Sequence, residues 1–311
     1  MARPNTYFFS CDHPDRYEPF SLDFGPVNIG VIHSFRTFMR EYVDNPALSD
    51  RELVYYTDEP VEVRTNAALL LAAYLLIDLG RSPEEAWAPF GGIECEGGGS
   101  PFATFRDATF NEQDYCLPAL ACLRGLRRAA ELGWYDPVTF DADEYHHLDH
   151  PCNADLHMCT PRIAAFKAPA MVPGEAPAGT LGFPPSHFVE LFGSKGITAV
   201  VRLSGRGAYP PEAFTSLGIA HHDLFVDDCA VPTLELVRKF IDIADAEPGL
   251  AVHCGSGLGR TGTLIAAYIM ARHGFGAAEA IGWLRLVRPG CVIGRQQHYL
   301  HTLERILLAA L

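Results

Sequence analysis

A cysteine and an arginine six residues apart mark the segment of this sequence with the clearest chemical meaning. Cys254 and Arg260 lie in the string Val-His-Cys-Gly-Ser-Gly-Leu-Gly-Arg-Thr, which runs from 252 to 261. Glycines between them let the backbone curl until successive N–H groups converge on one point, as they do in sites that hold a phosphate. The spacing therefore predicts an anion loop, which consists of Cys254, Gly255, Ser256, Gly257, Leu258, Gly259 and Arg260.

The residues at the two ends of the anion loop suggest a phosphoryl transfer. Arg260 can fork two oxygens of a phosphoryl group and stabilise the charge that builds in the transition state. The same positive field lowers a thiol pKa from ~8.5 to about 3.5–7.5, so we expect Cys254 to be a thiolate nucleophile. The Thr261 hydroxyl can donate a hydrogen bond to that thiolate. We expect His253 to hydrogen-bond to the backbone and so hold the loop in shape, and not to transfer a proton. A buried structural cysteine is the alternative, but it would leave the arginine and the glycines unexplained.

Departure of an alkoxide from phosphate needs a proton, and an acidic side chain on a loop that faces the anion loop could supply it. Asp227 and Asp228 follow an apolar segment and precede Pro232, where a helix is expected to begin. Chemistry alone does not separate these two aspartates. The alternative is that an aspartate here caps the helix that starts at Thr233.

Short apolar segments alternate with helical periodicity in the second half of the chain. This alternation predicts an α/β fold with a central sheet flanked by helices. The anion loop would then connect a strand to the helix that follows it. Strands are predicted at 198–203, 223–226 and 249–253, and helices at 27–42, 65–79, 117–132, 233–246, 260–273 and 277–287.

An internal match suggests that the fold is duplicated. Sliding the chain by 194 residues lays 67–86 over 261–280, with identities that include Tyr74 on Tyr268 and Gly80 on Gly274. A chance match of two alanine-rich helices is the alternative. If the duplication holds, Glu59 and Pro60 occupy the positions of His253 and the nucleophile, so the first copy should be inactive. We therefore predict an amino-terminal phosphatase-like domain over 1–140, a linker over 141–165 and a catalytic domain over 166–311.

Composition narrows the class of partner. A chain of 311 residues is long enough for two domains, each with its own core. The formal charge of −14 repels nucleic acid and anionic lipid headgroups, so neither is an expected partner, whereas a basic protein segment is. The nine cysteines are odd in number and scattered, which indicates reduced thiols in the cytoplasm or nucleus. The predicted chemistry needs no metal or cofactor, and nothing in the sequence indicates an oligomeric state.

These features together resemble the cell division cycle fourteen family of dual-specificity protein phosphatases. The longest matching segment, 257–266, contains most of the anion loop and the start of the helix after it. The resemblance implies two tandem dual-specificity-phosphatase-like domains with the active site at their junction. The other matching segments are 23–26, 66–68, 105–108, 140–145, 222–225, 251–254, 268–270, 288–290, 292–294 and 296–298.

The resemblance also implies roles for particular residues. The family pattern Asp-x-x-x-Pro, counted back from Pro232, assigns the general acid to Asp228, and Gln296 or Gln297 would position the hydrolytic water. Family members reverse phosphorylation by proline-directed kinases and prefer phosphoserine followed by proline, with a basic residue further on. The basic residue would bind an acidic groove in the linker, where Asp149 and Asp155 match two acids and His146 replaces the first.

Three alternatives to this reading remain. The linker could bind a metal through His146, His150, Cys152, His157 and Cys159, although their spacing fits no tetrahedral pattern. The protein could be a catalytically silent scaffold that binds phosphopeptides. It could also be a phosphoinositide phosphatase, but Gly255 and Ser256 stand where the family has lysine and alanine, and the loss of a cation disfavours a polyanionic substrate.

Overall fold

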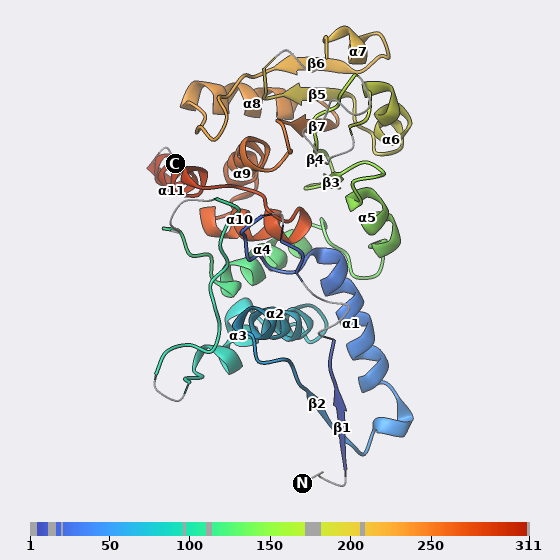
Figure 1. Cartoon of the computed structure of the whole chain (residues 1–311), viewed down its shortest axis with the longest axis vertical. Helices are drawn as coiled ribbons and strands as arrows, with labels where there is room; N and C mark the ends of the chain where they lie inside the picture. The colour runs from blue at the N-terminus through green and yellow to red at the C-terminus, as the bar shows by residue number, and fades with distance from the viewer. Residues whose placement is uncertain are drawn as a thin grey trace.

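The structure, a computed structural model, describes residues 5–11, 17–19, 21–95, 98–109, 114–171, 182–205 and 209–309. It confirms the predicted α/β fold, with a central sheet flanked by helices. Figure 1 shows the amino-terminal half at one end of the long axis and the carboxyl-terminal half at the other. Helices α4 (Ala119–Glu131) and α10 (Ala277–Val287) lie between them.

A five-stranded sheet forms the centre of the carboxyl-terminal half. Its strand order is β3-β4-β7-β5-β6; β3 is antiparallel to β4, and the other neighbours are parallel. Every residue of β4, β5 and β7 is buried, which is usual for parallel strands covered on both faces. The strands are β3 (Leu156–Met158), β4 (Ile163–Phe166), β5 (Ala199–Arg202), β6 (Ala220–Asp223) and β7 (Leu250–His253).

Helices cover both faces of this sheet because successive strand residues point to opposite sides. Val200 and Ala251 belong to one buried cluster with Phe192 and Phe214. Val201 and the other alternate residues belong to a second cluster with helices α8 and α9. The surrounding helices are η2 (Pro185–Phe188), α6 (Val189–Ser194), α7 (Glu212–Thr215), α8 (Leu234–Ala246), α9 (Gly259–His273) and α11 (Arg295–Ala309).

The strand predicted at 223–226 is wrong by three residues, since β6 covers Ala220–Asp223. Parallel pairing with β5 ends where Arg202 lies opposite Asp223. The buried Arg202 guanidinium forms two bonds to the Asp223 carboxylate, at 2.7 and 3.0 Å. Val226 is buried as well, but under the loop that leaves the sheet. Its apolar character therefore reflects burial in a loop and not membership of a strand.

The amino-terminal half is mainly helical. Among the described residues its sheet consists of β1 (Thr6–Phe9) and β2 (Glu52–Tyr55), which pair in parallel. From Ala67 onward, helix α2 (Val61–Ile77) is apolar on every side, and it lies between neighbouring helices, as a buried helix does. The remaining elements are α1 (Ile29–Val43), η1 (Pro46–Leu48) and α3 (Pro83–Gly91).

The helix pairs α2–α3 and α9–α10 are built alike, as the internal sequence match predicts. Gly80 and Gly274 follow the first helix of each pair with φ of 66° and 67°, a conformation that glycine adopts without strain. Glu85 and Glu279 each accept a hydrogen bond from the backbone N–H three residues earlier, at 2.9 and 3.0 Å. The same stop and start signals therefore occur at the positions that the match paired.

The two halves meet through direct backbone contact between α4 and α10. A Cβ placed on Gly125 would lie 2.5 Å from the carbonyl oxygen of Glu279, and one on Gly282 would lie 2.8 Å from the Cα of Cys122. Only glycine allows helices to approach so closely. Buried residues of both halves also belong to one continuous hydrophobic cluster. The junction is therefore part of the core.

The predicted linker range, 141–165, contains one helix and strands that pair with the catalytic sheet. Helix α5 (Ala142–Asp149) begins it, with Asp141 as its N-cap. Strands β3 and β4 fall in the same range or just beyond it, yet both hydrogen-bond into the catalytic sheet. The reason is that β4 pairs directly with β7, the strand that carries the anion loop.

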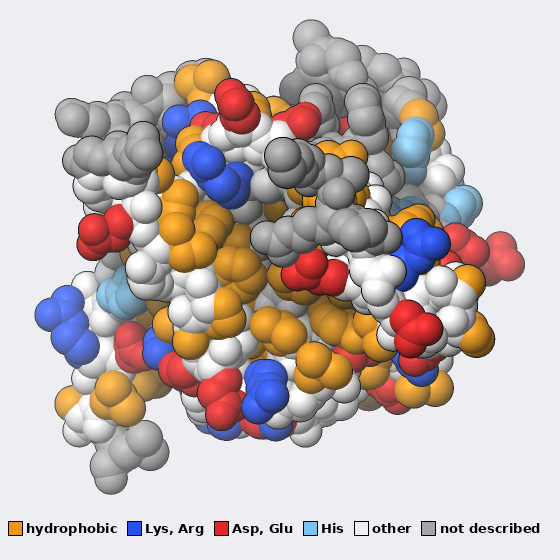
Figure 2. Space-filling model, turned by 90° about the horizontal axis from the view of Figure 1, so that it is seen from below, with side chains coloured by type: hydrophobic (Ala, Val, Ile, Leu, Met, Phe, Trp, Pro, Cys, Tyr) orange, Lys and Arg blue, Asp and Glu red, His pale blue; other side chains and the backbone are white. Residues whose placement is uncertain are grey.

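None of the described helices is long and apolar enough to cross a membrane. Figure 2 shows the end of the molecule that carries β1 and β2, where hydrophobic side chains gather and charged ones are scattered among them. Phe8 and Tyr56, at this end, are each 54% exposed.

Candidate active site

The anion loop connects the end of β7 to the start of α9, as predicted. Cys254 is only 2% exposed and follows directly from the buried strand. Gly257 has a φ of 71°, and a Cβ there would lie 2.1 Å from the carbonyl oxygen of Phe166. Gly255 has open space around it, with no atom nearer than Arg260 at 3.8 Å. Glycine is therefore essential to the curl at 257 and not at 255.

Every backbone carbonyl from Cys254 to Gly259 has a hydrogen-bond donor on the outside of the anion loop. Because the N–H and C=O of neighbouring residues oppose each other across a peptide plane, these bonds turn the loop's N–H groups inward. The loop is thus prepared for an anion before one binds. In chain order from Cys254, the donors are His253 Nδ1 (3.0 Å), Ala168 N (2.9 Å), Arg288 Nη2 (2.8 Å), Arg288 Nε (2.9 Å), Gly262 N (2.9 Å) and Thr263 Oγ1 (2.8 Å).

The pKa of the Cys254 thiol is lowered. Burial by itself raises it, but a hydrogen bond from Thr261, the positive charge of Arg260 and backbone N–H groups of the loop outweigh burial. The Thr261 hydroxyl is fully buried and bonds to no oxygen or nitrogen among the described residues, so the sulfur is the acceptor it faces. This arrangement favours the thiolate, the form that acts as a nucleophile.

His253 holds the start of the loop, as the sequence predicts. Its Nδ1–H donates to the carbonyl of Cys254 at 3.0 Å, and its Nε2 accepts from the Tyr209 hydroxyl at 2.5 Å. Burial lowers the pKa of His253 to about 3, because the low-polarity surroundings disfavour the imidazolium. The ring is therefore neutral at physiological pH and has both nitrogens engaged.

Asp228 is the aspartate that the structure places at the anion loop. Its Oδ1 lies 2.8 Å from Arg260 Nη2, while its side chain remains 81% exposed. Arg260 also donates from Nη1 to the carbonyl of Val226 at 3.0 Å, which ties it to the same loop. The capping alternative is wrong, because the side chain of Thr233 itself caps α8 by accepting from the N–H of Leu236.

The two candidate glutamines differ in position. Gln296 lies against the anion loop, since its Oε1 is 2.9 Å from where a Cβ of Gly259 would be. Its amide accepts from Ile293 N and donates to Ala230 O, both at 3.1 Å, so it also bridges to the loop that carries Asp228. Gln297 has both ends of its amide engaged elsewhere, with Arg285 at 2.6 Å and Gly294 at 3.2 Å.

The linker acids contact the catalytic domain through a buried arginine and histidine. Asp155 Oδ1 lies 2.7 Å from Arg288 Nη2, and Asp149 Oδ1 lies 2.9 Å from His157 Nε2. Arg288 also donates to His157 Nδ1 at 2.8 Å. Burial alone would raise the pKa of Asp149, but the bond from His157 and the neighbouring positive charge lower it. Burial lowers the pKa of His157, so its ring is neutral.

His146, the third predicted groove residue, is exposed on α5. Its ring lies beside α1, where a Cβ on Gly30 would come within 2.8 Å of it. The metal-site alternative needs His146, His150, Cys152, His157 and Cys159 to converge. No group of three or more potential metal ligands occurs in the described part of the chain, and His157 is bonded to Arg288 instead.

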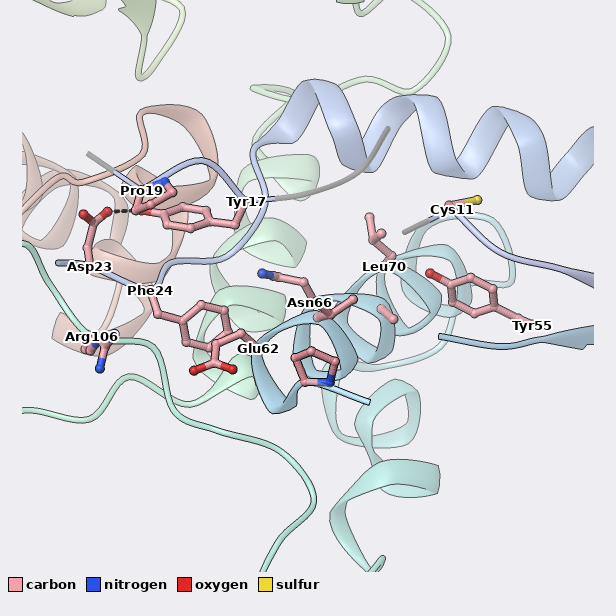
Figure 3. Close-up of a pocket in the computed structure, with 13 residues that line it drawn as sticks. Cys11, Tyr17, Pro19, Asp23, Phe24, Tyr55, Glu62, Asn66, Leu70 and Arg106 are labelled. Carbon is pink, nitrogen blue, oxygen red and sulfur yellow. Dashed lines mark hydrogen bonds between the residues drawn. The ribbon is translucent and has the colours of Figure 1, made fainter. Parts of the chain in front are cut away.

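A cavity of about 290 Å³ lies at the start of α2, at the place in the first half that corresponds to the anion loop. Figure 3 shows Glu62 and Asp23 near one end of it, Cys11 beside Tyr55 at the other, and Asn66 between them. The amide of Asn66 is already bonded to backbone groups of residues 25 and 27, at 3.1 and 3.0 Å. Cys11 and Arg106 both line the cavity, but Figure 3 shows them at opposite ends, so they do not form a pair like Cys254 and Arg260.

Sequence reasoning missed three residues that support the anion loop: Tyr209, His157 and Arg288. Each is a buried polar side chain from outside the loop. The string Arg-Pro-Gly at 288–290 was among the matching segments, but neither its type nor its spacing predicts contact with residues 256 and 257. Its partners are identified only by the packing of α10 beneath the loop.

Comparisons with known proteins agree with this geometry. Residues 1–129 match the family model for the N-terminal half of dual specificity protein phosphatases, and residues 186–274 match the model for the DSP-PTPase phosphatase of polymorphic toxin systems. Human dual specificity protein phosphatase CDC14A is 39% identical over 97% of this chain and 50% of its own length. The Saccharomyces cerevisiae tyrosine-protein phosphatase CDC14 is 33% identical over 94% of this chain and 54% of its own.

A solved structure, the kinase associated phosphatase with its catalytic cysteine replaced by serine, is 21% identical and covers 48% of this chain and 89% of its own, with a TM-score of 0.41. The chain spans about half the length of the curated relatives just named. Their identity nevertheless extends through both halves and the junction. Over the length it shares with them, the chain therefore belongs to the CDC14 family of dual specificity protein phosphatases.

Proposed function

We propose that this chain is a cysteine-dependent protein phosphatase that hydrolyses phosphoserine, phosphothreonine and phosphotyrosine through a cysteinyl-phosphate intermediate. One observation carries the proposal: Cys254, with a lowered thiol pKa, shares a loop with Arg260, which contacts Asp228 at 2.8 Å. A nucleophile, an anion-binding cation and a candidate acid thus converge on one preformed anion site.

In the first step, the Cys254 thiolate attacks phosphorus in line with the leaving oxygen. The S–P bond forms while the P–O bond breaks, and Asp228 gives its proton to the departing serine oxygen. A bound phosphate would take Arg260 from Asp228, because its oxygens can accept both N–H groups of the guanidinium fork. The exposed carboxyl would then be free to turn toward the leaving group.

In the second step, water attacks the cysteinyl phosphate. Asp228, now a carboxylate, takes a proton from that water, and the sulfur leaves as a thiolate. The buried Thr261 hydroxyl stabilises the charge on the sulfur. Gln296 lies beside the loop and is the better placed of the two glutamines to position the water.

Specificity is the finer part of the proposal. We infer a preference for phosphoserine followed by proline, with a basic residue further along the substrate. Support for the basic residue comes from Asp149, whose carboxylate faces a neutral histidine and is 38% exposed. The chain's charge of −14 favours the same kind of substrate.

A phosphopeptide panel tests the proposal. The peptide phosphoSer-Pro-x-Lys should have a kcat/KM at least about 10-fold above its Pro→Ala variant, in the range that one substrate pocket can discriminate. The Lys→Ala variant should be slower as well. Equal kcat/KM values for phosphoSer-Pro-x-Lys and its Pro→Ala variant would overturn the proposed preference for proline. Phosphate release from no peptide and no aryl phosphate would indicate a silent scaffold, and turnover limited to phosphoinositide vesicles would indicate a lipid phosphatase.

A further inference from the structure

Arg288 supports the anion loop from beneath. It lies on the turn after α10, is 2% exposed, and donates to the carbonyls of Ser256 and Gly257 at 2.8 and 2.9 Å. These two carbonyls belong to the middle of the loop, where Gly257 has its positive φ. A single guanidinium thus sets the direction of two successive peptide planes, whose N–H groups must face the phosphate.

The linker in turn holds Arg288. Asp155 contacts it twice, through its carboxylate at 2.7 Å and through its backbone carbonyl at 3.1 Å. The φ of Asp155 is 47°, a left-handed conformation that aspartate tolerates better than most residues. His157 accepts from Nη1 of the same guanidinium at 2.8 Å. Each N–H group of the Arg288 guanidinium that donates a hydrogen bond therefore donates it to a carbonyl of the anion loop or to a linker residue.

The two linker acids differ in how much of their charge is available to a substrate. Asp155 faces the permanently charged Arg288 and lies near Lys167, so its charge is already balanced within the fold. Its side chain is 26% exposed. Asp149 faces the neutral ring of His157 and is 38% exposed, so it keeps its net negative charge near solvent.

We propose that Arg288 is a positioning residue of the anion loop and that Asp155 serves Arg288 and not the substrate, which leaves Asp149 as the acid of the groove already proposed. This inference rests on the proposed phosphatase function. It divides the two matched groove acids into one that shapes the catalytic loop and one that selects the substrate.

The first test compares Arg288→Lys with Arg36→Lys. Arg36 is also buried and forms a two-pronged pair with Asp78, at 2.6 and 2.8 Å, in the amino-terminal half. Lysine keeps the charge but loses the fork in both. Arg288→Lys should lower kcat/KM on an aryl phosphate about 10–100-fold, as small misplacements of reacting groups do. Arg36→Lys should lower the melting temperature while the aryl phosphatase rate stays within about twofold of wild type.

The second test uses Asp155→Asn, since asparagine tolerates the positive φ. The pKa of Cys254 is measured from the pH dependence of its alkylation by iodoacetate. Removing a negative charge near the loop would by electrostatics alone lower this thiol pKa. The positioning role predicts the opposite: a loosened Arg288 lets the N–H groups turn away, and the pKa rises. An unchanged or lowered pKa in Asp155→Asn would overturn the proposal even if Arg288→Lys failed to fold.

The third test separates the two acids with peptides. Asp149→Asn should raise KM for phosphoSer-Pro-x-Lys about 10-fold more than it raises KM for the lysine-free peptide, as loss of one charge contact would. Asp155→Asn should slow both peptides and the aryl phosphate to a similar degree. A loss confined to the lysine peptide in Asp155→Asn would instead make Asp155 a substrate contact. The alkylation and aryl phosphate readouts do not depend on peptide preference, so they decide the inference even if the proline-directed function fails.

Discussion

The two strand–loop–helix units of this chain share a scaffold and differ in chemistry. In the second half, β7 leads through the anion loop to α9; in the first, β2 leads through residues 56–60 to α2. Gly80 and Gly274, which lie just after the two helices that follow, have nearly the same φ. The first loop, however, contains Asp58, Glu59 and Pro60 where the second has a cysteine and glycines, and Glu62 lies in the first turn of its helix.

The comparison distinguishes the residues that this fold requires from the residues that phosphate binding requires. Glutamate at a helix N-terminus is favourable to the helix, yet its charge opposes an anion at the same place. Pro60 removes a backbone N–H, whereas Gly257 allows one to turn inward. The first half has therefore kept the signals that start and stop helices and lost those that bind phosphate.

Loss of the nucleophile should have the largest effect. Cys254→Ser is expected to reduce hydrolysis of every substrate about 10⁴-fold or more, because serine is not ionised here and no other residue can form the intermediate. Binding of phosphopeptide should persist, since the loop N–H groups and Arg260 remain. Steady-state phosphate release and calorimetric titration measure the two. Substantial residual turnover would mean that the first half is not silent.

Loss of the general acid, Asp228, should have the second-largest effect on turnover. Asp228→Asn is expected to slow turnover of a phosphoserine peptide about 10²–10³-fold, the usual contribution of general acid catalysis. Asp227→Asn is the matched control and should change the rate less than about threefold, because the carboxylate that contacts Arg260 is that of Asp228. Single-turnover kinetics compare the two. A larger loss in Asp227→Asn would reassign the acid.

A substitution at the contact between α4 and α10 tests whether the two halves unfold together. Gly282→Ala should destabilise the protein by about 1–3 kcal/mol, because its Cβ would meet the backbone of α4 at 2.8 Å. Gly193→Ala in α6 meets no atom within 4 Å and should be neutral or stabilising by about 0.5–1 kcal/mol through helix propensity. Urea unfolding should show a single transition. Separate transitions for the halves would contradict the shared core.

The thiol titration should respond to Thr261. A hydrogen bond to the thiolate favours the charged form, so Thr261→Ala should raise the pKa of Cys254 by about one unit, worth roughly 1.4 kcal/mol. At a pH below both pKa values, the thiolate fraction and the alkylation rate should then fall about 10-fold. Thr263→Ala removes a hydroxyl that bonds to a backbone carbonyl and should shift the pKa less. Equal shifts would argue that the effect is structural.

The smallest effect is expected in the first half. Glu62→Gln removes a carboxylate from the cavity at the start of α2 and should change aryl phosphatase activity by less than about twofold, since no reacting group lies there. A marked change in kcat, with an unchanged melting temperature, would show that the two units are coupled during turnover.

Residues close in sequence were predictable because local backbone geometry determines their relation. A strand, a curled turn with Gly257 and a helix that follows at once bring Cys254, Arg260 and Thr261 together without help from distant residues. The same holds for the helix starts and stops of both copies. The strand expected at 223–226 was misplaced by three residues, because burial under a loop resembles burial in a sheet, and the helix expected at 65–79 begins four residues earlier, at Val61.

Partners far apart in sequence were decided by the tertiary structure alone. Arg288 bonds to carbonyls 31 and 32 residues away and to a linker residue 133 away, and the residue type gives no hint of these distances. The choice of Gln296 over Gln297 depends on which face of α11 meets the anion loop. The sequence by itself determined the chemistry of the anion loop; packing of α10, α11 and the linker around it decided which side chains hold it in shape, because hydrogen bonds between distant segments exist only once the core has brought them together.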